Sequence, residues 1–203
     1  MTEEAYIPNR FGRFLLLALE QTLGVSGFQA VLGRAGLRHL VAYPPDNLER
    51  GFPLGFIPRL MTALEEIYGI GKGRDLAFET GRACFHLGMP GFGFLIDLAG
   101  LLFPLLPIRT RARIGLETLA EMLNRFADGA VQVRKQGDHL VWVMEHCGVC
   151  GGRVTTSPCC HLMAGLLEET VRWATGRDSA TVTEVTCAAA GGPRCEMEID
   201  LGG

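Results

Sequence analysis

Six of the seven cysteines lie in one segment of the chain, between positions 147 and 195. Thiolates are ligands that zinc and iron–sulfur clusters prefer. The segment therefore predicts a metal site, with zinc as the expected ion and an iron–sulfur cluster as the alternative. Free thiols are a weaker interpretation, and disulfides would need an oxidising compartment that nothing else in the sequence supports. The seventh cysteine, Cys84, lies in a predicted helix and is expected to be an ordinary buried thiol.

A predicted hairpin brings together three of the expected ligands. Cys187 ends a strand over 180–186 and Cys195 begins a strand over 195–199, so the two thiols should meet across the connecting loop. Glu184 lies three residues before Cys187, and side chains alternate along a strand. Glu184 can therefore reach the same ion only if the strand bends or bulges before Cys187.

The fourth ligand is expected at the start of the preceding helix, from Cys160 or, in its place, Cys159. Three thiolates and one carboxylate would fill a tetrahedral zinc shell, and a filled shell is typical of a structural rather than a catalytic site. Cys147 and Cys150 form an additional Cys-x-x-Cys pair. This pair could bind a second zinc, hold an iron–sulfur cluster, act as a redox dithiol or lend one cysteine to the first site.

Two histidines, His146 and His161, adjoin cysteines and are alternate ligands or neighbours of the ligands. The sequence contains no HExxH motif, no strand-linked GxGxxG and no recognisable nucleophile–base pair. No catalytic residue is predicted, and a binding protein is favoured over an enzyme.

The elements that must position these residues change in character along the chain. Apolar residues recur at helical spacing in the first two-thirds, and short β-favouring runs follow. The helices are expected at 11–23, 25–35, 54–68, 74–87, 108–127 and 160–174, and the strands at 130–134, 140–144, 180–186 and 195–199. The predicted fold class is α+β, with a helical layer on a small twisted antiparallel sheet. We expect one domain over 1–203, with a helical part over 1–128 and two hairpins around one helix over 129–203.

Composition excludes several classes of function. The 203 residues carry a formal net charge of −3, and 48% of them are hydrophobic, so a disordered chain and a nucleic-acid-binding surface are not expected. The apolar run from Phe92 to Leu106 is shorter than the roughly 20 residues of a bilayer span and contains Asp97. We therefore expect no transmembrane segment. The acidic start resembles no secretory signal, which predicts a cytoplasmic protein.

An apolar pocket is also predicted. Several phenylalanines and one tryptophan could line a small-molecule site, in which Asp97 would face a polar group of a ligand or partner. The predicted pocket residues are Phe78, Phe85, Phe92, Phe94, Asp97, Phe103 and Trp142.

The run from about 111 to 199 resembles the 4-vinyl reductase domain family, which is related to the ligand-binding domains of aromatic-sensing bacterial regulators. The resemblance rests on CHLMAGLLEETVRWATGR at 160–177 and TVTEVTCAAAGGPRCEMEI at 181–199. The helical stretch EEIYGIGKGRDLAFETGR at 65–82 matches less distinctively.

The resemblance implies a fold shared with vesicle-tethering trafficking subunits and haem–nitric-oxide sensors, and generally a homodimer. It assigns Cys160 (or Cys159), Glu184, Cys187 and Cys195 as zinc ligands beside a site for a small apolar or aromatic molecule. One branch of the family is tied to bacteriochlorophyll biosynthesis, which implies a tetrapyrrole carrier or accessory protein. Two alternatives remain: a vinyl reductase that uses an external electron donor, and a scaffold subunit without a ligand.

Overall fold

A four-stranded antiparallel sheet forms the C-terminal part of the molecule in a computed structural model that describes residues 5–88, 105–127, 130–137 and 139–202. Its strands lie in the order β3–β4–β6–β5. Their bounds are Val131–Gln136 for β3, His139–Met144 for β4, Thr181–Thr186 for β5 and Cys195–Asp200 for β6. The two predicted hairpins are therefore confirmed, and β4 pairs with β6 to join them.

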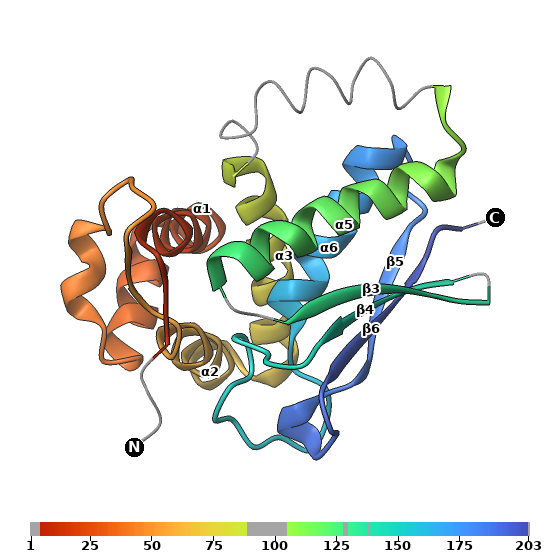
Figure 1. The fold of residues 1–203 in the computed structure, drawn as a ribbon. Coiled ribbons are helices and arrows are strands. Elements are labelled where there is room, and N and C mark those ends of the chain that lie inside the picture. The colour runs from red at the N-terminus through yellow and green to blue at the C-terminus, as the bar shows by residue number, and fades with distance from the viewer. Residues whose placement is uncertain (1–4, 89–104, 128–129, 138, 203) are drawn as a thin grey trace.

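The helices are layered beside this sheet. Helices α5 and α6 lie along the sheet, and α3 separates them from α1 and α2 on the side away from the strands (Figure 1). Their bounds are Asn9–Arg34 for α1, Phe56–Tyr68 for α2, Ile70–Gly88 for α3, Ile108–Ala127 for α5 and His161–Thr175 for α6. The predicted α+β class, a helical layer on a small antiparallel sheet, is confirmed.

Alternation along β6 explains how the sheet meets the helices. Cys195, Met197 and Ile199 are buried, whereas Glu196 and Glu198 between them are not. This two-residue period directs one face of the strand into the core. Cys195 is thereby fixed on the inner face at the very start of β6.

The first helix contains the break that its sequence predicts. Two helices were expected on either side of Gly24, and α1 has a kink there, with φ 70° and ψ 166°. Among the described residues, α1 is the one helix long and apolar enough to cross a membrane, with a mean hydropathy of 1.4 over its best window. Leu16, Leu19, Val31 and Leu32 of this helix are nevertheless fully buried in the protein core, as in the core helix of a soluble domain.

The glycine-rich run at 69–73 differs from its prediction as a linker. Helix α3 already begins at Ile70, and Gly69 alone adopts a positive φ, of 81°. Gly73 packs directly on the backbone of Glu65 in α2, where a Cβ atom would clash. Glycine at 73 therefore serves a close approach of helices.

Two short strands escaped prediction. Strand β1 covers Tyr6–Pro8 and β2 covers Arg50–Pro53, and they form a separate antiparallel pair. With three and four residues, they are too short to show an alternating pattern. A 3₁₀ turn at Arg38–Ala42 precedes β2, and another at Ala188–Ala190 connects β5 to β6.

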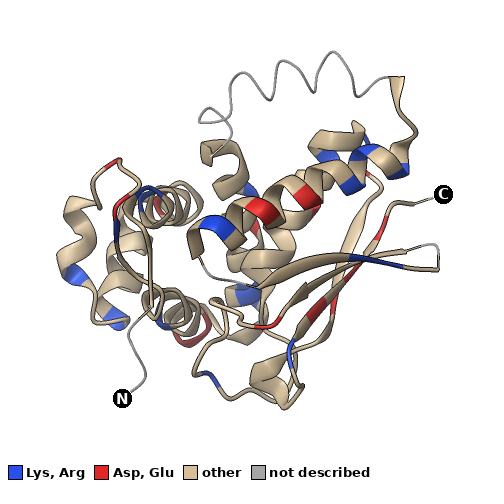
Figure 2. Ribbon diagram, in the orientation of Figure 1, with Lys and Arg blue, Asp and Glu red and all other residues tan. Residues whose placement is uncertain are grey.

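Acidic and basic side chains are interspersed along α5 and on the sheet (Figure 2). On α5, Arg113 pairs with Glu117 at 2.7 Å, one helical turn away. Such mixing accords with the small net charge of the chain.

Candidate metal centre and ligand cavity

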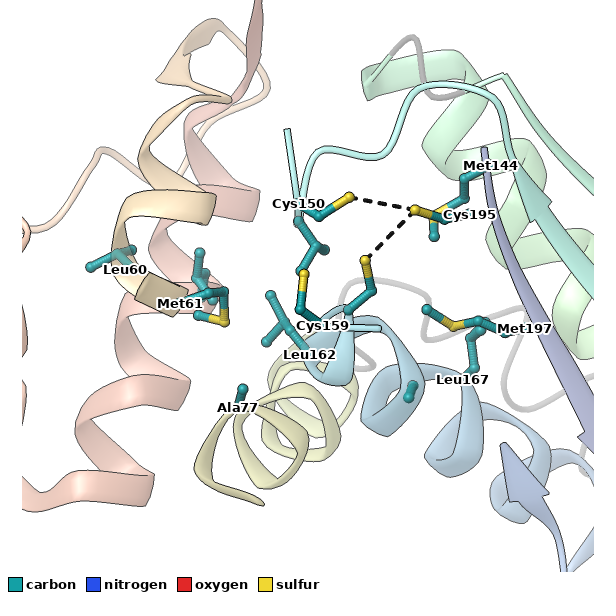
Figure 3. Close-up of a cluster of buried hydrophobic side chains, with 14 of the residues drawn as sticks. Leu60, Met61, Ala77, Met144, Cys150, Cys159, Leu162, Leu167, Cys195 and Met197 are labelled. Carbon is teal, nitrogen blue, oxygen red and sulfur yellow. Dashed lines mark hydrogen bonds between the residues drawn. The ribbon is translucent and has the colours of Figure 1, made fainter. Parts of the chain in front are cut away.

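Four segments converge on a cluster of cysteine sulfur atoms: the loop after β4, the start of α6, the end of β5 and the start of β6. The Sγ atoms of Cys160 and Cys195 lie 3.8 Å apart at its centre. Cys147 Sγ lies 3.4 Å from Cys160 Sγ, and Cys150 Sγ lies 3.4 Å from Cys195 Sγ. Figure 3 shows Cys150 and Cys195 pointing toward each other within the buried core.

A bulge in β5 brings Glu184 to the same cluster. The register of β5 against β6 shifts between Glu184 and Thr186, just before Cys187, as the sequence required. Glu184 Oε2 accepts a hydrogen bond from the backbone N–H of Cys160 at 2.7 Å. Its other oxygen, Oε1, is buried and has no hydrogen-bond partner. A buried carboxylate oxygen without a donor is costly unless a cation binds it.

Cys160, Glu184, Cys187 and Cys195 present ligand atoms that all lie within 4.8 Å of one another. A zinc ion about 2.3 Å from each sulfur of a tetrahedral site holds the sulfurs about 3.8 Å apart. The Cys160–Cys195 separation matches that spacing. The donor set thus fits a single soft divalent ion, which would cross-link α6, β5 and β6.

Two further features of the cluster bear on its charge. Burial raises the pKa of the Cys187 thiol, so this side chain needs a nearby positive charge to ionise. Cys195 Sγ accepts a hydrogen bond from the backbone N–H of Ala188 at 3.3 Å, an interaction that favours a thiolate.

The alternate ligands are placed differently. Cys159 is buried, and its Sγ lies 3.9 Å from that of Cys187, but it belongs to neither group of converging ligand atoms. His161 is also outside both groups; burial lowers its pKa, and its Nε2 is buried without a hydrogen-bond partner. His146 contributes to neither group and lines a cavity instead.

That cavity, of about 490 Å³, lies between α1, α3, α5, α6 and the loop after β4. Within the described ranges, its wall contains no Asp, Glu, Lys or Arg. The lining side chains are almost all aliphatic, aromatic or sulfur-containing, and they include Phe11, Phe14, Phe85, Leu119, Met122, Leu123, Met163, Leu166 and Trp173.

Polar groups on the cavity wall are few. His146 is one, and Thr118 and Thr170 supply hydroxyls that already donate to carbonyl oxygens within their own helices. Cys84 also lines the cavity, and burial raises its pKa to about 12. Its thiol is therefore neutral near pH 7 and is part of the apolar wall.

The predicted pocket residues have mixed positions. Phe85 lines the cavity, whereas Phe78 and Trp142 do not. Trp142 is completely buried because β4 is an interior strand of the sheet, where its side chain is part of the core. Phe78 packs partly on that core from α3. Phe92, Phe94, Asp97 and Phe103 lie outside the described residues.

Sequence reasoning missed most of the true wall. Leu119, Met122 and Leu123 belong to the apolar face of α5, whose helical spacing was evident. That spacing does not distinguish a side chain that fills the core from one that borders a cavity.

Solved structures define the class of fold. An H-NOX protein from K. algicida, in its Fe(II) unliganded state, superposes with a TM-score of 0.62 at 13% identity and covers 96% of each chain. An H-NOX protein from S. oneidensis in the Fe(II)NO state gives 0.56 at 11% identity, over 94% of this chain and 98% of that one. The phenol-responsive sensory domain of the transcription activator PoxR, with phenol, gives 0.52 at 17% identity, over 77% and 78%.

The family match lies at the C-terminal end. Residues 140–201 match the family model of the 4-vinyl reductase domain, so the resemblance found in the sequence is confirmed. This stretch contains most of the cysteine cluster and nearly all of β4, α6, β5 and β6. No curated protein matches the chain.

Proposed function

We propose that this protein binds a neutral, largely apolar small molecule in the cavity beside the cysteine cluster. The observation that carries the proposal is the cavity of about 490 Å³, whose described wall has no Asp, Glu, Lys or Arg. Pockets for small ligands typically have about 300–1,000 Å³ and a mostly apolar wall with a few polar groups. The phenol-bound PoxR domain, with a similar fold, supports the same class of ligand.

The size of the cavity favours a ligand larger than one aromatic ring. An apolar cavity of about 150 Å³ is enough to hold benzene, and this one is about three times as large. A fused-ring aromatic, a lipid-like molecule or a tetrapyrrole is the better match. His146 would then form a hydrogen bond with a polar substituent of the ligand. In its narrowest form, the proposal is a tetrapyrrole carrier or accessory protein in bacteriochlorophyll biosynthesis.

A structural zinc ion is the second part of the proposal. Cys160, Glu184, Cys187 and Cys195 would hold it, and the unpartnered Oε1 of Glu184 is the observation that favours a bound cation. Ligand atoms within 4.8 Å of one another suit one ion better than the wider spacing of a four-iron cluster. Such an ion stiffens the cavity from outside, because its ligands come from α6, β5 and β6.

Ligand binding can be tested with a size series of neutral probes: phenol, a two-ring naphthol and a divinyl tetrapyrrole. Isothermal titration should show tighter binding of the larger probes. Leu119→Trp, which fills the cavity from α5, should abolish it, and Glu121→Trp, on the exposed side of α5, should not. Equal binding by the two variants, or no binding of any probe by the native protein, would overturn the proposal.

The same protein distinguishes a carrier from a reductase. Incubation of the divinyl tetrapyrrole with a supplied reductant should return the compound unchanged. Catalytic loss of a vinyl group would instead establish the reductase. The cytoplasmic location and the homodimer remain predictions; light scattering of the purified protein tests the latter.

Metal dependence has its own test. The binding free energy of an ion that has no preformed site in the unfolded chain contributes to folding. Removal of zinc by a chelator under reducing conditions should therefore lower the Tm. An unchanged Tm after complete removal would refute the structural role.

A further inference from the structure

Two tetrahedral groups of ligand atoms meet in the cysteine cluster. One consists of Cys160, Glu184, Cys187 and Cys195, and the other of Cys147, Cys150, Cys160 and Cys195. In each group, all ligand atoms lie within 4.8 Å of one another. The groups share two sulfurs, so they are two tetrahedra with a common edge.

The common edge has the length that either ion requires. Cys160 and Cys195 Sγ lie 3.8 Å apart, which equals the edge of about 3.8 Å for a tetrahedral zinc–thiolate site. The outer pair is close on the other side, with Cys147 Sγ 3.4 Å from Cys160 and Cys150 Sγ 3.4 Å from Cys195. Cys147 and Cys150 therefore adjoin the same two sulfurs that the first site uses.

We infer that the protein holds two zinc ions, with the thiolates of Cys160 and Cys195 bridging them. Cys147 and Cys150 bind only the second ion, and Glu184 and Cys187 bind only the first. The inference rests on the zinc site of the proposed function and extends it to a dinuclear centre.

Charge balance favours the second ion. Its two added ligands ionise when it binds, so their two negative charges equal the charge of the ion and the centre becomes no more anionic. Arg153 lies close enough to interact electrostatically with Cys160. Its side chain is 8% exposed, and its Nη1 is buried without a hydrogen-bond partner. This guanidinium supplies positive charge beside the bridging sulfurs.

Stoichiometry tests the inference. The full chain, loaded with excess zinc under reducing conditions and desalted, should show two zinc ions in native mass spectrometry. The double variant Cys147→Ser/Cys150→Ser should retain one ion and the native circular dichroism spectrum. Cys159→Ser is the matched control, because Cys159 is equally buried beside the cluster but belongs to neither group, and it should retain two.

Bridging has a separate signature. With ¹¹³Cd in place of zinc, the β-protons of Cys160 and of Cys195 should each correlate with two cadmium resonances. One ion per native chain, loss of the second ion in Cys159→Ser, or two resonances without shared cysteines would overturn the dinuclear centre. A native chain that binds no ion would refute the proposed zinc site itself, whereas one ion would leave that site intact.

Discussion

Gly81 of α3 and Gly165 of α6 mark a reciprocal backbone contact between the two helices. A Cβ atom on Gly81 would overlap the carbonyl oxygen of Leu162, and one on Gly165 would overlap that of Phe78. Both obstacles are backbone atoms, which cannot rotate away. This contact fixes α6, whose first turn presents Cys160, against α3, which forms part of the cavity wall.

Gly81→Ala and Gly165→Ala should each destabilise the fold. Overpacking of this kind costs about 1–3 kcal/mol or more, and a chain of this size loses roughly 2–4 °C in Tm per kcal/mol. Gly71→Ala in the same helix α3 is the matched control, since its Cβ would meet nothing within 4 Å. It should be neutral or stabilise by up to about 1 kcal/mol. Thermal melts in which Gly71→Ala and Gly81→Ala behave alike would contradict the close contact.

Glu184→Gln should weaken zinc binding while preserving the local fold. The amide oxygen of glutamine can still accept the hydrogen bond from Cys160 N–H, but the negative charge is lost. We expect at least a tenfold loss of affinity, about 1.4 kcal/mol, in competition titrations with a chromophoric chelator. Glu198→Gln on β6, whose side chain is 42% exposed near His139, should leave the affinity unchanged. Equal affinities of the two variants would exclude Glu184 as a ligand.

Asn124→Ala should detach the end of α5 from the sheet. Asn124 Nδ2 donates to the carbonyl oxygen of Val131 at 2.8 Å, and Oδ1 accepts from its N–H at 2.6 Å. Loss of both bonds should cost about 1–3 kcal/mol, as measured by urea unfolding. Gln132→Ala, which removes a side chain bonded only to exposed Arg134, is the control and should cost less than about 0.5 kcal/mol. A cost for Asn124→Ala no larger than that of the control would show that the two bonds contribute nothing.

Cys84 should resist alkylation in the native protein. Its pKa is raised from about 9 to about 12, so its thiolate fraction at pH 8 is about a thousandfold below that of an unperturbed thiol. Brief treatment with iodoacetamide, followed by peptide mass mapping, should find Cys84 unmodified in the folded chain and modified in guanidinium. Because the folded pKa is the higher one, reactivity should rise as the pH rises toward 12. Rapid native alkylation at pH 8 would contradict the apolar environment.

The sequence predicted best where covalent spacing constrains geometry. Glu184 and Cys187 could face one point only if β5 bulged between them, and it does. Gly24 predicted a helix break because a positive φ is easy for glycine alone, and α1 kinks there. The cavity wall was harder to predict, because the apolar face of α5 has the same period whether it meets a core or a hollow. Trp142 illustrates the opposite error: a large aromatic residue on a central strand is core.

One short loop, residues 145–150, belongs to both sites at once. His146, Gly148 and Val149 border the cavity, while Cys147 and Cys150 join the sulfur cluster. An occupant that shifts this loop changes the affinity for the metal, and thermodynamic reciprocity requires the metal to change the affinity for the occupant by the same factor. The loop would thus make a cell's zinc status and its supply of the small molecule inputs to a single equilibrium.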